Sequence, residues 1–115
     1  MSNVIETKTF RFAIRIVNLY KYLTADKKEY ILSKQLLRSG TSIGANVSEA
    51  QKAQSKPDFY AKMSIALKEA NETFYWLRLL KETGYLSNNQ FDDIVADADE
   101  IISILTAICK NTKLK

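Results

Sequence analysis

Four stretches of apolar residues with helical spacing dominate the sequence, and short polar turns separate them. The last stretch is the clearest, because apolar side chains recur every three or four residues from Phe91 to Cys109 while nearly all nearby acidic residues fall on the opposite face. One Pro and three Gly in 115 residues leave few turns for an all-β fold. The sequence therefore predicts an all-α protein.

Capping signals mark the ends of the later helices. The segments Ser55–Asp58 and Ser87–Gln90 each have a Ser followed three residues later by an acidic or amide side chain, and Gly84 supplies a left-handed helix end. Because the connections are short, neighbouring helices should run antiparallel as an up-down four-helix bundle. The predicted helices span about residues 6–23, 28–54, 56–83 and 88–110 of a single domain, 1–115.

The first and third predicted helices carry two apolar faces each, whereas a monomeric bundle buries one face per helix. We interpret the second faces as contacts between copies of the chain, which predicts a homo-oligomer. The alternative is a monomer with an apolar surface. The candidate interface residues are Phe12, Ile16, Ile65, Trp76 and Leu79.

Charge is distributed unevenly along the chain. Residues 1–28 carry six basic and two acidic side chains, a net +4, whereas residues 85–110 carry one basic and five acidic, a net −4. A basic strip on the first helix is the candidate nucleic-acid site, and copies of it on a ring would form a large cationic surface. Alternatively, these cations pair with the acidic fourth helix. The candidate residues are Lys8, Arg11 and Arg15, extended by Lys21, Lys27 and Lys28.

Small and hydroxyl side chains are concentrated between Arg38 and Gln51, inside the second predicted helix. Two glycines in a helix interior, Gly40 and Gly44, cost about 1 kcal/mol each relative to Ala. Close approach of another helix would offset this cost, with hydrogen bonds across the contact from Ser42, Asn46 and Glu49. Alternatively, Gly44 gives a ligand access to the backbone.

The same segment resembles a known family. The sequence from Leu37 to Ala50, its continuation to Phe59 and the segment Ser64–Leu80 are similar to those of the 23S ribosomal RNA intervening-sequence proteins. The resemblance implies an antiparallel four-helix bundle that assembles into a homopentameric barrel. A similar fold serves as the accessory variability determinant of diversity-generating retroelements, which is thought to bind nucleic acid and a reverse transcriptase.

The resemblance implies that residues of this chain at the positions of the family motif have the same role as in the family, although many members have Pro at the position of Gly44 and Gly at that of Ala50. We interpret the polar residues at these positions as residues that fix the register of a packed helix seam. The seam residues are Arg38, Ser42, Gly44, Asn46, Glu49, Glu69 and Glu72.

Catalytic chemistry finds little support in the sequence. The chain has no His, which removes most metal-dependent and acid–base schemes, and it has no Gly-rich phosphate-binding loop. A nucleophile such as Ser42 lacks a base. We expect no catalytic residue, metal or cofactor, and a buried thiol at Cys109. No signal peptide or apolar run of about 18 residues is present, so we expect a cytoplasmic protein without a membrane partner.

Together these features predict a non-enzymatic oligomeric scaffold that binds structured RNA or DNA through basic faces of the first helix. The alternative is a protein–protein interaction module that docks a polymerase or another nucleic-acid-processing protein without touching nucleic acid. In that case the charge serves solubility alone. Lys113 and Lys115 are interpreted as a basic tail.

Overall fold

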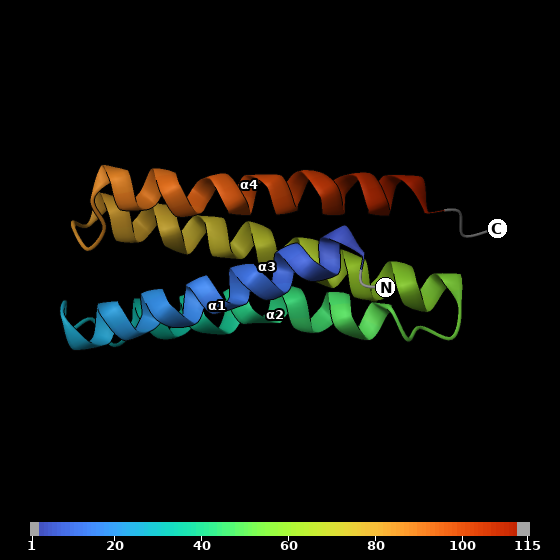
Figure 1. Cartoon of the computed structure of the whole chain (residues 1–115), viewed down its shortest axis with the longest axis horizontal. Helices are drawn as coiled ribbons and strands as arrows, with labels where there is room; N and C mark the ends of the chain where they lie inside the picture. The colour runs from blue at the N-terminus through green and yellow to red at the C-terminus, as the bar shows by residue number, and fades with distance from the viewer. Residues whose placement is uncertain (1–2, 113–115) are drawn as a thin grey trace.

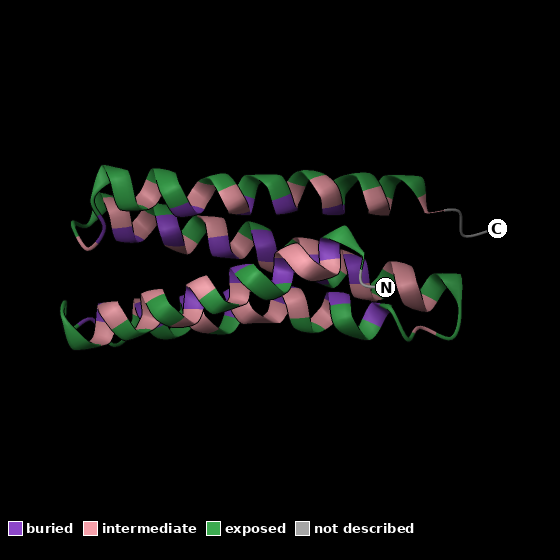
Figure 2. Ribbon diagram, in the orientation of Figure 1, coloured by how far each residue is buried: buried purple, intermediate pink, exposed green. Residues whose placement is uncertain are grey.

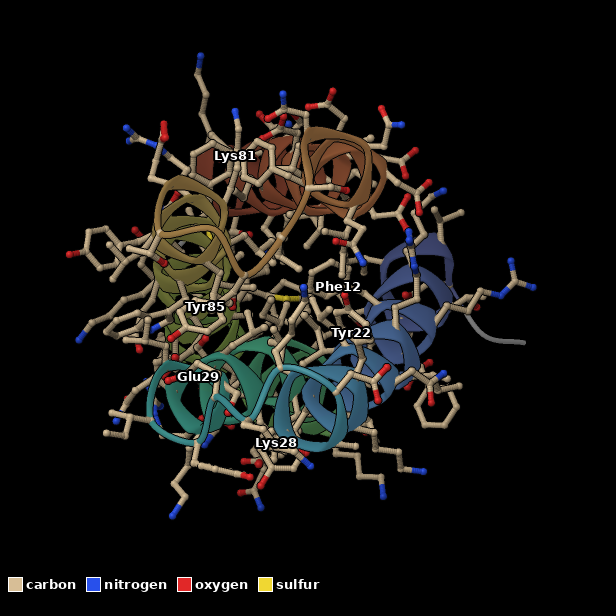
Figure 3. The ribbon with its side chains drawn as sticks, turned by 90° about the vertical axis from the view of Figure 1, so that its left-hand side faces the viewer. Phe12, Tyr22, Lys28, Glu29, Lys81 and Tyr85 are labelled. Atoms are coloured by element: carbon tan, nitrogen blue, oxygen red, sulfur yellow. The ribbon has the colours of Figure 1, made fainter. Side chains whose placement is uncertain are left out.

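The computed structural model describes residues 3–112, which fold as a bundle of four α-helices without a strand (Figure 1). This confirms the predicted all-α four-helix bundle. The helices are α1 (Val4–Ala25), α2 (Leu32–Ala50), α3 (Lys56–Glu82) and α4 (Asn88–Asn111). Each packs against the next in the chain, and α1 closes only lightly against α4. Seen end-on, α1 and α3 therefore lie at opposite corners (Figure 3). Lys113 and Lys115 lie outside the described residues.

The core consists mainly of aliphatic side chains from all four helices. Residues on the outer side of α4 are largely exposed, and its buried residues face inward (Figure 2). This matches the single apolar stripe of α4. The largest fully buried side chains are Phe12, Ile16, Leu23, Leu36, Ile43, Met63, Leu77, Leu80, Ile101, Leu105 and Val47, with Thr9 among them.

The predicted caps at both ends of the α3–α4 connection and at the start of α3 are confirmed. Ser55 Oγ accepts a hydrogen bond from the Asp58 backbone N–H at 3.2 Å. Ser87 and Gln90 form a reciprocal capping box with distances of 3.1 and 2.8 Å. Gly84 has a φ of 88°, the left-handed conformation that glycine adopts without steric conflict. These ends depend on local sequence, so local rules locate them.

The start of α2 differs from the prediction, which placed it near residue 28. Lys28 has a φ of 56°, a left-handed conformation that costs a non-glycine residue about 1 kcal/mol. The chain then turns, and the Glu29 carboxylate accepts hydrogen bonds from the backbone N–H groups of Ile31, Leu32 and Ser33 at 3.1, 3.0 and 2.7 Å. Glu29 thus occupies the amino end of α2. Helix α2 also ends earlier than predicted, at Ala50.

The predicted oligomer interface on α1 was assigned to the wrong face. Phe12 is 1% exposed and Ile16 is 0% exposed, so both belong to the core and cannot contact another copy. The opposite face instead exposes Phe10 and Ile14, at 68% and 49%. Both faces of α1 are apolar, and periodicity alone does not say which one faces inward.

The three interface candidates on α3 do reach the outer side of the bundle. Ile65 is 41% exposed, and Trp76 and Leu79 are half-buried. Tyr75 is also exposed on this helix and contacts the Trp76 ring edge-to-face, with centroids 5.1 Å apart. The outer side of α3 therefore presents a mixed aromatic and aliphatic surface.

Close packing of α1 on α2 explains the two glycines in α2. A Cβ added at Gly40 would lie 2.8 Å from two side-chain carbons of Ile16, and one added at Gly44 would lie 3.2 Å from the Thr9 backbone oxygen. Both distances are too short for ordinary contact, so larger residues would push the helices apart. This close approach offsets the helix-propensity cost of the glycines.

Gly40→Ala should lower the free energy of unfolding by about 1–3 kcal/mol, because the β-branched Ile16 is stiff and buried and cannot move aside. Urea denaturation measures the change. Ser48→Ala, at an exposed position of the same helix, is the matched control and should be nearly neutral. A more stable Gly40→Ala protein would contradict the close packing.

Glu29→Gln should lower stability by about 1 kcal/mol at neutral pH, because the charge at the helix amino end is lost. Burial opposes ionisation of Glu29, but the backbone N–H donors outweigh it and lower its pKa. A lowered pKa means that the stabilisation is present above the ordinary Glu pKa and is lost as pH falls through the folded value. Denaturation from pH 7 to pH 2 should therefore show the two proteins converging in acid. A constant difference would argue against the charge effect, with exposed Glu82→Gln as the control.

Candidate nucleic-acid interface

The basic strip of α1 divides into paired and unpaired cations. Arg15 donates to Asp97 at 2.6 Å and to Asp93 at 2.5 Å, and Lys8 lies 3.2 Å from Glu100. Partial burial opposes the charge of Arg15, but the two carboxylates outweigh it and raise its pKa. These pairs join α1 to α4 where the two helices pack lightly. For Lys8 and Arg15, the structure therefore favours pairing with the acidic helix.

The other predicted cations are exposed and free of ion pairs with any residue from 3 to 112. Arg11 and Lys21 lie on the outer side of α1, and Lys27 and Lys28 lie in the α1–α2 connection. Lys27 Nζ lies 6.0 Å from the centre of the Tyr22 ring, a loose cation–π contact. These four cations are available to an anionic partner.

The carboxylates of the predicted seam lie in a polar cluster on the surface of α2 and α3. Arg38 of α2 forms ion pairs with Glu72 and, at 3.4 Å, with Glu69. The Trp76 indole N–H donates to Glu72 at 3.0 Å, and this bond together with Arg38 outweighs partial burial and lowers the pKa of Glu72. Further along, Glu49 pairs with Lys62 at 3.1 Å. These contacts fix α2 against α3 within one chain.

Ser42 and Asn46 do not make the predicted hydrogen bonds across a helix contact. Ser42 donates to the Arg38 carbonyl at 2.6 Å, and Asn46 donates to the Ser42 carbonyl at 2.8 Å, so both satisfy their own helix. The buried hydroxyl pair that joins the helices is Thr73 and Ser39, 3.0 Å apart. Ser39 shares the apolar stripe of α2, a position from which its burial could have been predicted.

Comparison with known proteins identifies the family of this chain and supports its fold. A family described as 23S rRNA-intervening sequence protein matches residues 2–107. The chain belongs to this family. A crystal structure of a protein with unknown function from the S23 ribosomal protein family of Bacteroides thetaiotaomicron VPI-5482 is 55% identical, with a TM-score of 0.93. That match covers 94% of this chain and 100% of the other. No curated protein matches the chain.

In this member of the intervening-sequence family, Gly44 lies beside an open groove as well as against α1. The groove has a volume of about 310 Å³, and its lining includes Phe10, Arg11 and Ser48. Gly44 thus permits the close approach of the Thr9 backbone, and it also leaves room beside the exposed Phe10 ring. The structure therefore supports the packing role of Gly44, and ligand access to its backbone stays a prediction.

The described helices and acidic side chains were also compared with the requirements of a membrane span and of a metal site. None of its four helices combines the length and apolar character that a membrane span requires. Within residues 3–112, no three Cys, Asp or Glu side chains gather closely enough to hold a metal ion. Cys109 is half-buried, with its sulfur 3.8 Å from the Ser64 hydroxyl.

Proposed function

We propose that this family member is a non-enzymatic, cytoplasmic scaffold that binds RNA or DNA as a homo-oligomer. The observation that carries the proposal is the set of exposed, unpaired cations on α1 and the α1–α2 connection: Arg11, Lys21, Lys27 and Lys28. The family's description, which refers to 23S rRNA, supports an RNA partner. We do not include Lys8 and Arg15 in the proposed site, because acidic side chains of α4 already form ion pairs with them.

Binding by these cations would depend on contacts with phosphates. Each phosphate that a lysine or arginine neutralises releases condensed counterions, so affinity falls steeply as salt rises. Four cations on one chain are few, but a ring multiplies the lysines of the α1–α2 connection around one of its faces. Oligomerisation and nucleic-acid binding therefore reinforce each other in this proposal.

The proposed assembly is a ring in which α1 of one copy packs on α3 of the next. The exposed apolar residues Phe10 and Ile14 of α1 and Ile65 and Tyr75 of α3 lie at opposite corners of the bundle. Contact between two different surfaces is heterologous and closes into a ring when the rotation permits. The expected number of five copies comes from the family resemblance.

A second candidate function is docking of a nucleic-acid-processing protein. The groove beside Phe10 favours it, because a site lined by this ring together with Glu6 and Arg11 could accept a side chain from a partner. Capture of the same partner with and without nuclease distinguishes the candidates. Two results together would favour docking: the partner stays bound after nuclease treatment, and the purified protein itself binds no nucleic acid.

Arg11→Glu combined with Lys21→Glu should weaken RNA binding at least tenfold and reduce the slope of log affinity against log salt by about 2, one for each lost phosphate contact. A filter-binding salt titration measures both quantities. Lys52→Glu combined with Lys56→Glu is the matched control, since these exposed lysines lie in and beside the α2–α3 connection and outside the proposed site. Failure of the wild type to bind RNA or DNA at low salt would refute the function.

Ile65→Glu should dissociate the ring while helicity stays unchanged, because this side chain is already 41% exposed in the single chain. Light scattering should then show a 13.1 kDa species in place of a larger one. Asn71→Glu adds the same charge at an exposed polar position of α3 and should leave the assembly intact. A wild-type protein of 13.1 kDa would disprove the oligomer.

A further inference from the structure

The α1–α2 connection holds a lysine in a conformation that lysine does not favour. Lys28 has a φ of 56°, whereas the corresponding turn between α3 and α4 uses Gly84, with a φ of 88°. Gly or Asn would adopt the left-handed conformation at Lys28 with less strain. The Lys28 side chain is exposed and makes no ion pair with the described residues, so it adds nothing evident to the fold. Backbone strain of this kind is often found at functional sites.

An exposed aromatic ring stands among the lysines of this connection. Tyr30 is 58% exposed, and the adjacent Ile31 is 76% exposed. Lys27 and Lys34 are exposed on either side of them in the sequence. The end-on view shows Lys28 at the outer edge of the bundle (Figure 3). The exposed aromatic side chain of Tyr30 and several exposed lysines therefore lie in one short segment of the chain.

The acidic residue within this segment does not offset its charge at the surface. The Glu29 carboxylate is buried and occupied by three backbone N–H donors. It also blocks the amino end of α2, so an anion could not bind there and would have to meet the lysines instead. The exposed acid nearest in sequence is Asp26.

The rest of this end of the bundle is also basic. Residues 21–34 carry four basic and two acidic side chains, and residues 78–85 carry two basic and one acidic. Together these two segments carry six basic and three acidic side chains. The acid in residues 78–85 is the exposed Glu82 at the end of α3, and α4 contributes the exposed Asp92 about one turn after its start. Asp93 is paired with Arg15. The excess of positive charge therefore persists at this end.

We propose that this end of the bundle binds single-stranded nucleic acid, with an unpaired base stacked on Tyr30 and the flanking phosphates contacted by Lys27, Lys28 and Lys34. The site rests on the proposed nucleic-acid function and specifies its substrate class. Stacking on an aromatic side chain requires a free base face, which a single strand offers and a duplex hides. Lysine–phosphate contacts alone would not distinguish the two.

An anionic membrane would also attract exposed lysines beside apolar side chains. A helix that lies on a membrane buries an extended apolar face, however. Here only Tyr30 and Ile31 are exposed large apolar residues in the connection, and α2 continues from them with exposed Lys34 and Gln35. The chemistry therefore favours nucleotides over lipid.

Fluorescence anisotropy with a 20-nucleotide RNA of mixed sequence, single-stranded or annealed to its complement, tests the site on the full chain. The single strand should bind at least about tenfold more tightly than the duplex. Tyr30→Ala should weaken single-strand binding at least about fivefold and leave duplex binding unchanged, while Tyr30→Phe should keep wild-type affinity.

The strained lysine supplies an independent variant. Lys28→Asn should reduce affinity for the single strand and lower its salt slope by at least about 0.7, while the Tm stays the same or rises. Lys52→Asn, which removes an exposed lysine at the opposite end, should leave affinity unchanged. Weaker binding together with undiminished stability separates a binding role from a structural one.

The outcomes distinguish this site from the broader function. Nucleic-acid binding that is equal for single strand and duplex, or insensitive to Tyr30→Ala, would overturn the site and leave the proposed function standing. No binding to either RNA would overturn both. Tyr30-dependent binding to vesicles containing phosphatidylserine, without RNA binding, would reassign this end of the bundle to a membrane surface.

Discussion

The contact between α1 and α2 at Gly40 is the constraint on which the rest of the bundle depends. Because Gly40 has no side chain, Ile16 fills the space above it, and the Thr9 backbone rests against Gly44 one turn away. This contact fixes which side of α1 faces inward. The same rotation turns Arg15 toward α4 and leaves Arg11 in solvent. A packing detail in α2 thereby decides which cations of α1 are free.

Different interactions close the remaining seams. The α2–α3 seam combines aliphatic packing with the Ser39–Thr73 hydroxyl pair and the ion pairs of Arg38. The α1–α4 seam is packed more lightly, and charged side chains span it. The two oppositely charged ends of the sequence thus partly neutralise each other in three dimensions. The net charge of residues 1–28 therefore overstates the basic surface of α1, and the uncompensated charge lies at Arg11, at Lys21 and in the α1–α2 connection.

Local sequence rules predicted the helix caps correctly. They failed for the inward face of α1, which tertiary contacts determine. The caps at Ser55 and Ser87 followed from spacing alone. The inward face of α1 did not, because Phe10 and Phe12 belong to two equally apolar stripes and only packing on Gly40 selects one. The start of α2 was missed because a glutamate, not a typical cap residue, holds it. Sequence reasoning named six basic candidates but not Lys34, and three-dimensional distances were needed to separate the paired cations from the unpaired ones.

An even number of helices has a consequence for any assembly of this chain. The first and last described residues lie at the same end of the bundle, and the α1–α2 and α3–α4 connections lie at the other (Figure 1). Rotational symmetry keeps every subunit pointing the same way. A ring of these bundles would therefore have two unlike faces, one bearing the chain termini and one bearing Lys28 and Tyr30. Cargo fused to either terminus would project away from the lysine face and leave it unobstructed.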